Sequence, residues 1–400
     1  DHTIDYTYSG VLSIPERVRF LGHRFTVTAV RDGAFDFYYE RNGTKRTCQI
    51  SSVRIPSSVI TIGECSFREC HNMTSVQFEG ESSLQSIGSS AFYYTGLRSF
   101  ALPASVVSLG TSTFESSSAL SDVVFEGDGI NVLPNRCFAF TGLRDLSFLA
   151  GSVSSLGDYC FRGASLASAD IPAHIGRMGA GVFRECRVME HSAFAEGCPI
   201  TEIPSETFME CTSLQYYDFA PWVNSIELDS FRDSGLLELY VPTTLTYLGE
   251  GAFRSCENLV DVTFAEGHGL LELMPSVFRD CDELTELTVP DSVRVIGENA
   301  LSGCERLETF VMPASLEKIA AFALSDCLSL VSVVFQSDAR YVASASSSFY
   351  HDNVLESVVF WDKRCDSLMF PSSLPTYYCT VSYYASKAAV GVTPLSRFVV

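Results

Sequence analysis

Lysine is scarce in this chain of 400 residues, and acids outnumber all cations, with 48 Asp and Glu against 27 Lys and Arg. The formal net charge is therefore −21 at pH 7. Nucleic-acid binding requires clustered cations that neutralise phosphate groups, and docking on anionic lipid has the same requirement. The charge balance thus argues against nucleic acid, and against a membrane surface, as the partner of this segment.

The sequence also lacks an apolar run of roughly 18 to 20 residues, the length that spans a membrane as a helix. No secretory signal sequence opens the chain. It begins with Asp1 and not with methionine, so we expect a processed or trimmed amino terminus whose missing part carried the targeting information. Its 46% of hydrophobic residues are enough for a large core.

Motifs that carry catalysis or bind metal are missing as well. There is no G-x-S-x-G, no phosphate loop and no dinucleotide fingerprint. The seven histidines form neither H-x-x-x-H nor H-E-x-x-H, and the 14 cysteines include no Cys-x-x-Cys pair. The acidic stretch DGAFDFYYE at 32–40 does not fit the ligand spacing of a calcium loop. The sequence therefore predicts no enzyme, no cofactor and no metal site.

What the sequence does contain is a recurring phrase, an aliphatic residue, a glycine, an aromatic residue and a cysteine. It occurs as IGECSFREC at 62–70, LGEGAFRSC at 248–256 and IGENALSGC at 296–304. Alignment on the aromatic position gives an interval of 32 residues and then intervals of 22 to 25. Self-similarity at such a period indicates a continuous repeat array. The aligned positions are Phe35, Phe67, Phe92, Phe114, Phe138, Phe161, Phe183, Phe208, Phe231, Phe253, Phe278, Leu301, Leu324 and Phe349.

Each repeat has a second anchor of the form Leu-x-x-Val-x-Phe, as in LLELYV at 236–241 and LVDVTF at 259–264. The alternation of apolar and polar residues is typical of a short strand. Proline ends the strand in IPSSV at 55–59, and acid with glycine ends it in FEGDG at 125–129. An apolar crossing, V-x-x-I/L-G, and a short turn around the aromatic residue complete the repeat.

One such unit cannot bury its own apolar edge, whereas stacked units can. We therefore predict a repeat solenoid of the leucine-rich-repeat type, with about 14 repeats of 22–25 residues. Its parallel β-sheet should line the concave face, and short helical or irregular turns should form the convex face. We expect an opening repeat and cap at 1–49, the array at 50–360 and a carboxy-terminal cap at 361–400.

Seven cysteines occupy the position three residues after the aromatic. Equivalent positions of a solenoid stack into a column, and a small, readily buried side chain suits it, so we expect a ladder of free thiols. They are Cys70, Cys186, Cys211, Cys256, Cys281, Cys304 and Cys327. Cys365 and Cys379 lie off the repeat, and a disulfide between them in the cap is left open.

The full repeat, as in ISSVRIPSSVITIGECSFREC at 50–70 and LTELTVPDSVRVIGENALSGC at 284–304, resembles the BspA-like, treponemal-type class of leucine-rich repeats. The resemblance covers roughly residues 10–360, with departures at Leu301 and Leu324 and in the weak strand MEHSAF at 189–194. It implies a surface or secreted binding protein, because members are associated with adhesion to host proteins and to other cells. Members share no catalytic site, so no catalytic residue is implied.

The outward positions of the predicted strands carry about one carboxylate per strand and almost no lysine. These acids either keep an exposed sheet soluble or form a binding face for a basic protein partner. Tyrosines beside acids are typical interface anchors, which makes Tyr216, Asp218, Glu238 and Tyr240 the most attractive spot. The candidate partner-binding residues are Asp170, Tyr216, Asp218, Glu238, Tyr240, Asp261, Glu286 and Glu308.

Two functional hypotheses follow. The first is a non-enzymatic, cell-surface or secreted repeat protein that binds a protein partner, possibly a host or cell-surface protein, through its acidic concave face, as adhesins do. The second is a cytoplasmic interaction scaffold of the same fold, because a thiol ladder needs no oxidising compartment. Glycan at the sequons of Asn42 or Asn72 would distinguish them, since N-glycosylation marks the secretory route.

Overall fold

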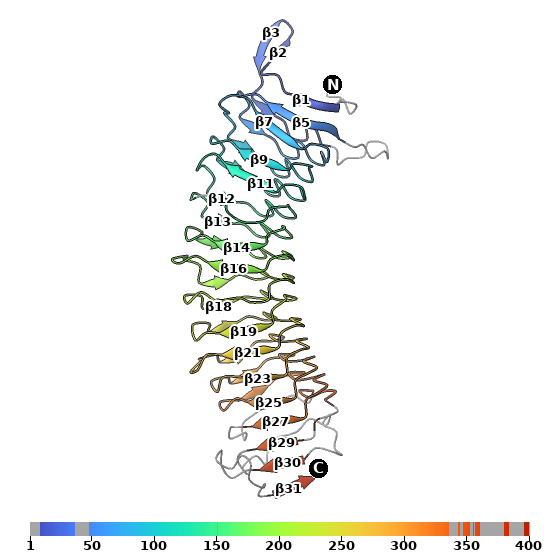
Figure 1. The fold of residues 1–400 in the computed structure, drawn as a ribbon, viewed down its shortest axis with the longest axis vertical. Helices are drawn as coiled ribbons and strands as arrows, with labels where there is room; N and C mark the ends of the chain where they lie inside the picture. Colours follow the sequence, from blue (N-terminus) through green and yellow to red (C-terminus); the bar gives the residue numbers. More distant parts are fainter. Residues whose placement is uncertain are drawn as a thin grey trace. The chain divides into compact units, whose positions relative to one another are not determined.

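The computed structural model describes residues 9–36, 48–149, 151–335, 343–344, 347–352, 355, 357–360, 380–383 and 396–399. The chain divides into two compact units, unit 1 at Asp1–Ile200 and unit 2 at Thr201–Val400. Figure 1 shows the strands of both units, coloured along the sequence. The predicted boundaries between caps and array, at 49/50 and 360/361, stay predictions.

Unit 1 stacks two rows of parallel strands, one of longer strands and one of two-residue strands. The longer row comprises β1 (Ser9–Ser13), β5 (Gln49–Ile55), β7 (Ser75–Phe78), β9 (Ser99–Leu102), β11 (Asp122–Phe125), β14 (Ser168–Ile171) and β16 (His191–Phe194). The short row comprises β4 (Ala29–Val30), β6 (Thr61–Ile62), β8 (Ser86–Ile87), β10 (Ser108–Leu109), β12 (Val132–Leu133), β13 (Ser155–Leu156) and β15 (Arg177–Met178). An antiparallel hairpin, β2 (Arg17–Phe20) with β3 (His23–Thr26), lies between β1 and β4 in the sequence.

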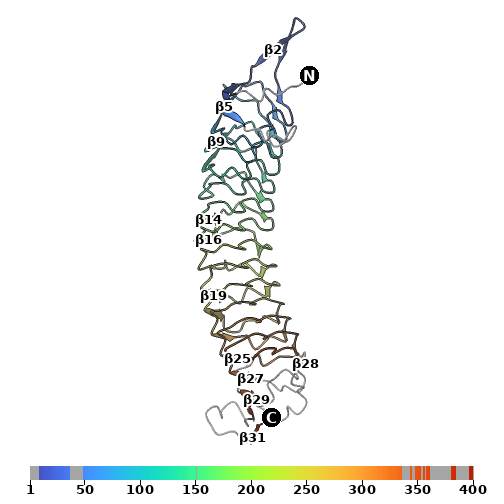
Figure 2. The same ribbon diagram turned by 90° about the vertical axis from the view of Figure 1, so that its right-hand side faces the viewer.

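Unit 2 repeats this plan. Its longer row comprises β19 (Glu238–Val241), β21 (Asp261–Phe264), β23 (Glu286–Thr288), β25 (Thr309–Met312), β27 (Ser332–Phe335), β29 (Ser357–Phe360), β30 (Thr380–Tyr383) and β31 (Ser396–Val399). Only β31 in that row is antiparallel to its neighbour. The short row comprises β17 (Glu202–Ile203), β18 (Ser225–Ile226), β20 (Tyr247–Leu248), β22 (Glu272–Leu273), β24 (Val295–Ile296), β26 (Lys318–Ile319) and β28 (Ala343–Ser344). Figure 2 shows β25 and β27 at one edge of this unit and β28 at the other.

The predicted fold class is confirmed. The chain is a parallel β-solenoid of about 12 turns with a leucine-rich-repeat-like fold. None of the residues that the structure describes is helical, so the turns around the aromatic position take the irregular form and not the helical one.

The aromatic positions form a stacked column inside each unit. In unit 1 the rings of Phe67 and Phe92 lie 5.5 Å apart, and their planes differ by 7°. In unit 2 the ring centroids of Phe253 and Phe278 are also 5.5 Å apart. All four side chains are fully buried. Offset stacking of buried rings adds about 0.5–1.5 kcal/mol per pair to the burial of their area, so each turn is held to the next through its aromatic residue.

The glycine of the recurring phrase is required for close approach between turns and not for a positive φ. A Cβ atom built on Gly297 would lie 2.7 Å from the carbonyl oxygen of Leu273 and from the nitrogen of Pro275, in the preceding turn. Gly249 is equally close to the carbonyl carbon of Glu227. Only a residue without a side chain lets the backbone of one turn lie against the next at this corner.

The backbone turns at the aromatic position form a ladder of hydrogen bonds from one turn of the solenoid to the next. This ladder was not predicted. The amides of Cys65, Phe67 and Glu69 donate to the carbonyls of Ser89, Ala91 and Tyr93 in the next turn, each at 2.9 Å. Cys65 and Glu69 have φ values of 54° and 60°. A left-handed conformation costs a non-glycine residue about 1–2 kcal/mol, and these inter-turn hydrogen bonds hold it in place. The pattern recurs at Ser90 and Tyr94, at Ser112 and Ser116, and at Asp229 and Asp233.

Two segments with the residue pattern of the strand anchor, at 143–148 and 214–219, are not strands in the structure. In the first, Asp145 Oδ1 accepts a hydrogen bond from the amide of Ser147 at 2.9 Å, a local turn that competes with a strand ladder. In the second, Tyr217 is buried, with its ring 5.1 Å from that of Phe208. Both segments still make an inter-turn backbone bond, because their carbonyls accept from the amides of the next turn.

Candidate binding face

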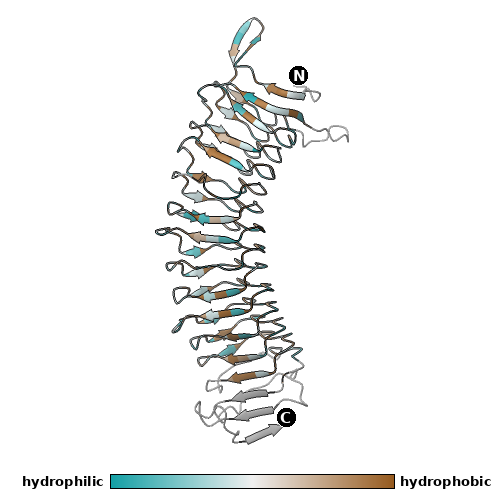
Figure 3. Ribbon diagram, viewed as in Figure 1, coloured by the Kyte–Doolittle hydropathy of each residue, from teal (hydrophilic) through white to brown (hydrophobic). Residues whose placement is uncertain are grey.

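The longer strand row of unit 2 presents a regular outward surface, which we call the strand face of unit 2. It consists of the outward side chains of segment 214–219 and of β19, β21, β23, β25 and β27, together with the residue that precedes each strand. Residues of these strands alternate between exposed and buried, as in Glu238–Val241. Figure 3 colours both hydrophilic and hydrophobic residues along such strands. The predicted period of two therefore places the predicted site residues of this unit outward.

Five carboxylates lie on this face, and its outward positions, all within the described part of the chain, include neither lysine nor arginine. Glu238 and Asp261 are directly opposite each other in the parallel pairing of β19 with β21. Like charges at this spacing destabilise a sheet. Asp261 also accepts a hydrogen bond from the hydroxyl of Thr263 at 2.8 Å. The five acids are Asp218, Glu238, Asp261, Glu286 and Glu308, all of them exposed.

Two tyrosines stand among these acids. The exposed fraction is 56% for Tyr216 and 59% for Tyr240, high values for large aromatic side chains. The carbonyl of Gln215 accepts a hydrogen bond from the amide of Leu237 at 3.0 Å, which joins the turn of Tyr216 to that of Tyr240. The structure thus brings Tyr216, Asp218, Glu238 and Tyr240 into adjacent turns, on one face. Val260, 47% exposed, adds apolar area beside them.

Asp170 is the one candidate partner-binding residue in unit 1. It lies on β14, and its Oδ1 is 3.3 Å from Nε2 of His191, on β16. Both side chains are largely exposed. Asp170 is therefore paired with a titratable ring of its own unit, and its role in partner binding stays a prediction.

The longer strand row of unit 1 differs in charge from that of unit 2. Its outward positions include the cations Arg54, Arg98 and Arg144 beside acids such as Asp122 and Glu190. The outward residues of the predicted strands were expected to form one acidic series, so this difference between the units was not predicted. Counting cations as well as acids at the outward positions of each half would have found it.

The cysteine column is buried, as predicted. Its thiols donate to the carbonyl of the aromatic residue in the preceding turn, at 3.2 Å from Cys256 to Phe231 and at 3.3 Å from Cys281 to Phe253. Burial raises the pKa of Cys256 and of Cys304 to about 12. Thiols held neutral in this way are poor nucleophiles and poor metal ligands, so these cysteines act as small hydrogen-bond donors in the core.

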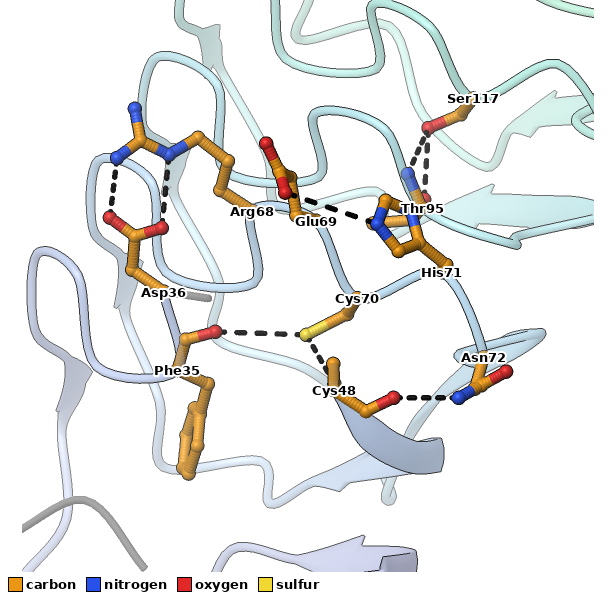
Figure 4. Close-up of polar contacts among 10 residues, drawn as sticks. All are labelled: Phe35, Asp36, Cys48, Arg68, Glu69, Cys70, His71, Asn72, Thr95 and Ser117. Carbon is orange, nitrogen blue, oxygen red and sulfur yellow. Dashed lines mark hydrogen bonds and ion pairs between the residues drawn. The ribbon is translucent and has the colours of Figure 1, made fainter. Parts of the chain in front are cut away.

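Of the predicted glycosylation and disulfide sites, the structure describes only Asn72. Asn42, Cys365 and Cys379 lie outside the described residues. Asn72 is exposed, and its Nδ2 donates a hydrogen bond to the carbonyl of Cys48 at 2.7 Å (Figure 4).

No group of three or more His, Cys, Asp or Glu side chains among the described residues could hold a metal ion. No helix in the described part of the chain is long and apolar enough to cross a membrane.

A sequence profile of the BspA type leucine rich repeat region matches residues 43–163, 132–260 and 271–370, most of the chain. No curated protein matches the chain. Several solved structures share its fold at low sequence identity, among them the following three.

The first is the pneumococcal vaccine antigen PcpA, with a TM-score of 0.61 and 20% identity over 96% of this chain and 91% of that one. A leucine-rich repeat protein from Bacteroides ovatus has a TM-score of 0.54 and 19% identity, and 94% of each chain is covered. A leucine-rich cell-surface protein from Faecalibacterium prausnitzii has a TM-score of 0.50 and 22% identity, over 82% of this chain and 88% of that one.

Proposed function

This chain belongs to the BspA type leucine-rich repeat family, and from that premise we propose that it is a non-enzymatic, cell-surface or secreted protein that binds a basic segment of another protein. The strand face of unit 2 is the proposed contact surface. Family membership supports the surface location and the absence of catalysis. The similarity of fold to a vaccine antigen and to a cell-surface protein is in keeping with both.

The observation that carries the proposal is the unbalanced charge of this face. Five carboxylates stand there without a lysine or arginine at any outward position of the face. Solubility alone requires charge, but it does not require charge of one sign, and unit 1 meets the same need with a mixed face. Tyr216 and Tyr240 provide the large, rigid aromatic area that anchors interfaces, and the surrounding acids select a cationic partner and speed its encounter.

The test is binding of the full chain to an array of purified extracellular proteins at low and at high salt. We compare it with the variant E238Q/D261N/E286Q, which removes three charges at nearly constant shape. The control D122N/E126Q/E190Q removes three exposed charges from unit 1. We expect about a tenfold or greater loss of affinity for the captured proteins in the first variant only. Equal affinity in both variants contradicts the proposal.

Substitution of one tyrosine on the strand face and of one tyrosine outside it provides a second test of the same surface. Tyr240→Ala should weaken binding by about tenfold, because an exposed tyrosine at an interface centre is a frequent hot spot. Tyr247, 40% exposed on the short strand β20, provides the matched control. If Tyr247→Ala weakens binding as much as Tyr240→Ala does, the contact is not specific to the strand face.

The alternative function, a cytoplasmic scaffold of the same fold, is supported by the free cysteines. All twelve in the described residues are free thiols, and nearly all of them are buried, so the core needs no disulfide. Intact mass of the protein from its native source decides between the two locations. Glycan mass at Asn42 or Asn72 contradicts the scaffold, whereas an unmodified mass with every thiol free favours it.

A further inference from the structure

Cys48 and Cys70 are placed differently from the rest of the thiols. Their Sγ atoms lie 2.7 Å apart, and the two residues are 1% and 0% exposed (Figure 4). Cys70 is the first member of the cysteine column, yet its Sγ is 3.6 Å from the carbonyl of Phe35. The corresponding distances for Cys281 and Cys304 are 3.3 and 3.2 Å. Cys70 therefore has a weak carbonyl contact and a thiol neighbour at closer range.

Several contacts hold the pair in this position. Asn72 Nδ2 donates to the carbonyl of Cys48 at 2.7 Å, and strand β5 begins at the next residue, Gln49. On the other side, the guanidinium of Arg68 makes two hydrogen bonds to the carboxylate of Asp36, at 3.0 and 2.6 Å. A two-point Arg–carboxylate contact is geometrically specific. The backbones on both sides of the two thiols are thus fixed by contacts that do not involve sulfur.

We propose that Cys48 and Cys70 are a disulfide site, which links the residue that precedes β5 to the turn that follows it when the chain folds in the presence of a thiol oxidant. The oxidant class is a disulfide, such as glutathione disulfide or the disulfide of an oxidoreductase. The inference rests on the proposed surface location only for whether the bond forms in the native source. The pairing itself rests on geometry.

The chemistry balances as two exchange steps. The Cys48 thiolate attacks one sulfur of the oxidant, a mixed disulfide forms, and the first thiolate leaves and takes up a proton. The Cys70 thiolate then attacks the Cys48 sulfur, and the second thiolate leaves and is protonated in turn. Two thiols of the chain are oxidised, and one disulfide is reduced to two thiols.

The folded chain gives the two sulfurs different environments. The hydrogen bond with Cys70 lowers the pKa of Cys48, while burial raises the pKa of Cys70. Both sulfurs are buried there, so a bulky oxidant reaches them before the amino-terminal turns have packed, and the completed bond is shielded from reductants. In that unpacked state either thiol can attack first, and the two steps balance in either order.

The location gives the bond a structural role. Repeat arrays unfold from their ends, because an end turn has only one neighbour. A cross-link that closes the segment between 48 and 70 constrains the unfolded state of the first complete repeat. It thereby ties down the amino-terminal end of the array.

The experiment uses the full chain, refolded with glutathione and glutathione disulfide, alkylated without reduction and digested with trypsin. The sequence separates the relevant cysteines, because peptide 47–54 contains Cys48, peptide 55–68 contains Cys65 and peptide 69–98 contains Cys70. We expect peptides 47–54 and 69–98 to be joined and to separate on reduction, with Cys65 alkylated. Alkylation of both Cys48 and Cys70, or a bond from Cys48 to Cys65, overturns the proposal.

Stability gives an independent measurement. Reductant should lower the melting temperature of the oxidised wild type by roughly 5 °C. Cys48→Ser should remove this response to reductant, whereas Cys256→Ser, at the column position that is equivalent to Cys70, should keep it. A reductant response that is as large in Cys48→Ser as in the wild type contradicts the assignment.

Protein from the native source then tests the location separately. The joined peptides in that sample support both the site and an oxidising compartment. If the pair is joined after refolding with glutathione disulfide but free in the native source, the disulfide site stands and the proposed surface location fails.

Discussion

At the scale of single residues, the position three after the aromatic holds a small, buried side chain, which is a hydrogen-bond donor in most turns and an alanine at Ala164. Cys281 provides the donor as a thiol, and Ser117 provides it as a hydroxyl that donates to a backbone carbonyl of the preceding turn at 2.9 Å. Sulfur chemistry is therefore not what this column selects. Asp352 is unusual in this column, because it follows Phe349 by three residues and is only 1% exposed.

Asp352 is held as a neutral acid. Its Oδ1 accepts from the amide of Cys327 at 3.0 Å, and its Oδ2 has no partner among the described residues. Burial, aided by the charge of Asp326, raises its pKa from 3.8 to about 8. The folded chain therefore keeps a proton that the unfolded chain releases near pH 4. Between these two values, stability falls as pH rises.

The first prediction concerns this carboxyl. Wild-type stability should fall between about pH 4 and pH 8, whereas Asp352→Asn should flatten that dependence and be the more stable form near pH 8. Urea denaturation at a series of pH values measures this. Glu266→Gln, at an exposed acid of the same unit, is the control and should keep the wild-type slope. Parallel curves for wild type and Asp352→Asn would show that Asp352 ionises normally.

At the scale of elements, the glycine corner sets how closely consecutive turns can pack. The backbone of the preceding turn leaves no room for a Cβ at Gly297, but a Cβ at Gly269 would meet nothing within 4 Å. Both glycines are in unit 2, and neither has a positive φ. The two positions therefore separate the effect of close approach from that of backbone freedom.

The second prediction uses this contrast. Gly297→Ala should destabilise the chain by about 1–3 kcal/mol, because the added methyl forces the two turns apart. Gly269→Ala should be neutral or slightly stabilising, since alanine restricts the unfolded chain. Denaturation midpoints of the two variants against wild type provide the measurement. Equal effects at both positions would mean that the corner can relax.

Sequence alone predicted those elements whose signal repeats. The aromatic spacing predicted the stacked column of Phe67 and its equivalents, and the period of two predicted that Glu238 and Tyr240 point outward. The turn ladder escaped prediction because its left-handed positions are occupied by residues such as Cys65 and Glu69, which do not mark a positive φ. Segment 143–148 matches the strand pattern, but the hydrogen bond from the amide of Ser147 to the carboxylate of Asp145 forms a local turn there in place of a strand.

At the scale of the whole molecule, charge separates the two units more clearly than fold does. The chain carries a formal charge of −21, which favours solubility but weakens any compact state through self-repulsion. Unit 1 offsets outward acids such as Asp122 with arginines such as Arg98, and the strand face of unit 2 has no such offset. Repulsion between the acids of that face therefore lowers the stability of the folded chain. A role of these acids in binding would explain why they are present.

The third prediction tests that trade-off. In E238Q/D261N/E286Q, loss of repulsion between neighbouring strands should raise the free energy of unfolding near 0.01 M salt by up to about 1 kcal/mol per opposed pair, and the melting temperature should rise with it. The gain should vanish near 1 M salt, where charges a few ångströms apart are already screened. D122N/E126Q/E190Q should show little gain at either salt concentration, because arginines on that face already compensate. A variant that is both more stable and unable to bind would show that the acids are kept for a partner, whereas a variant that is less stable would assign them a structural role instead.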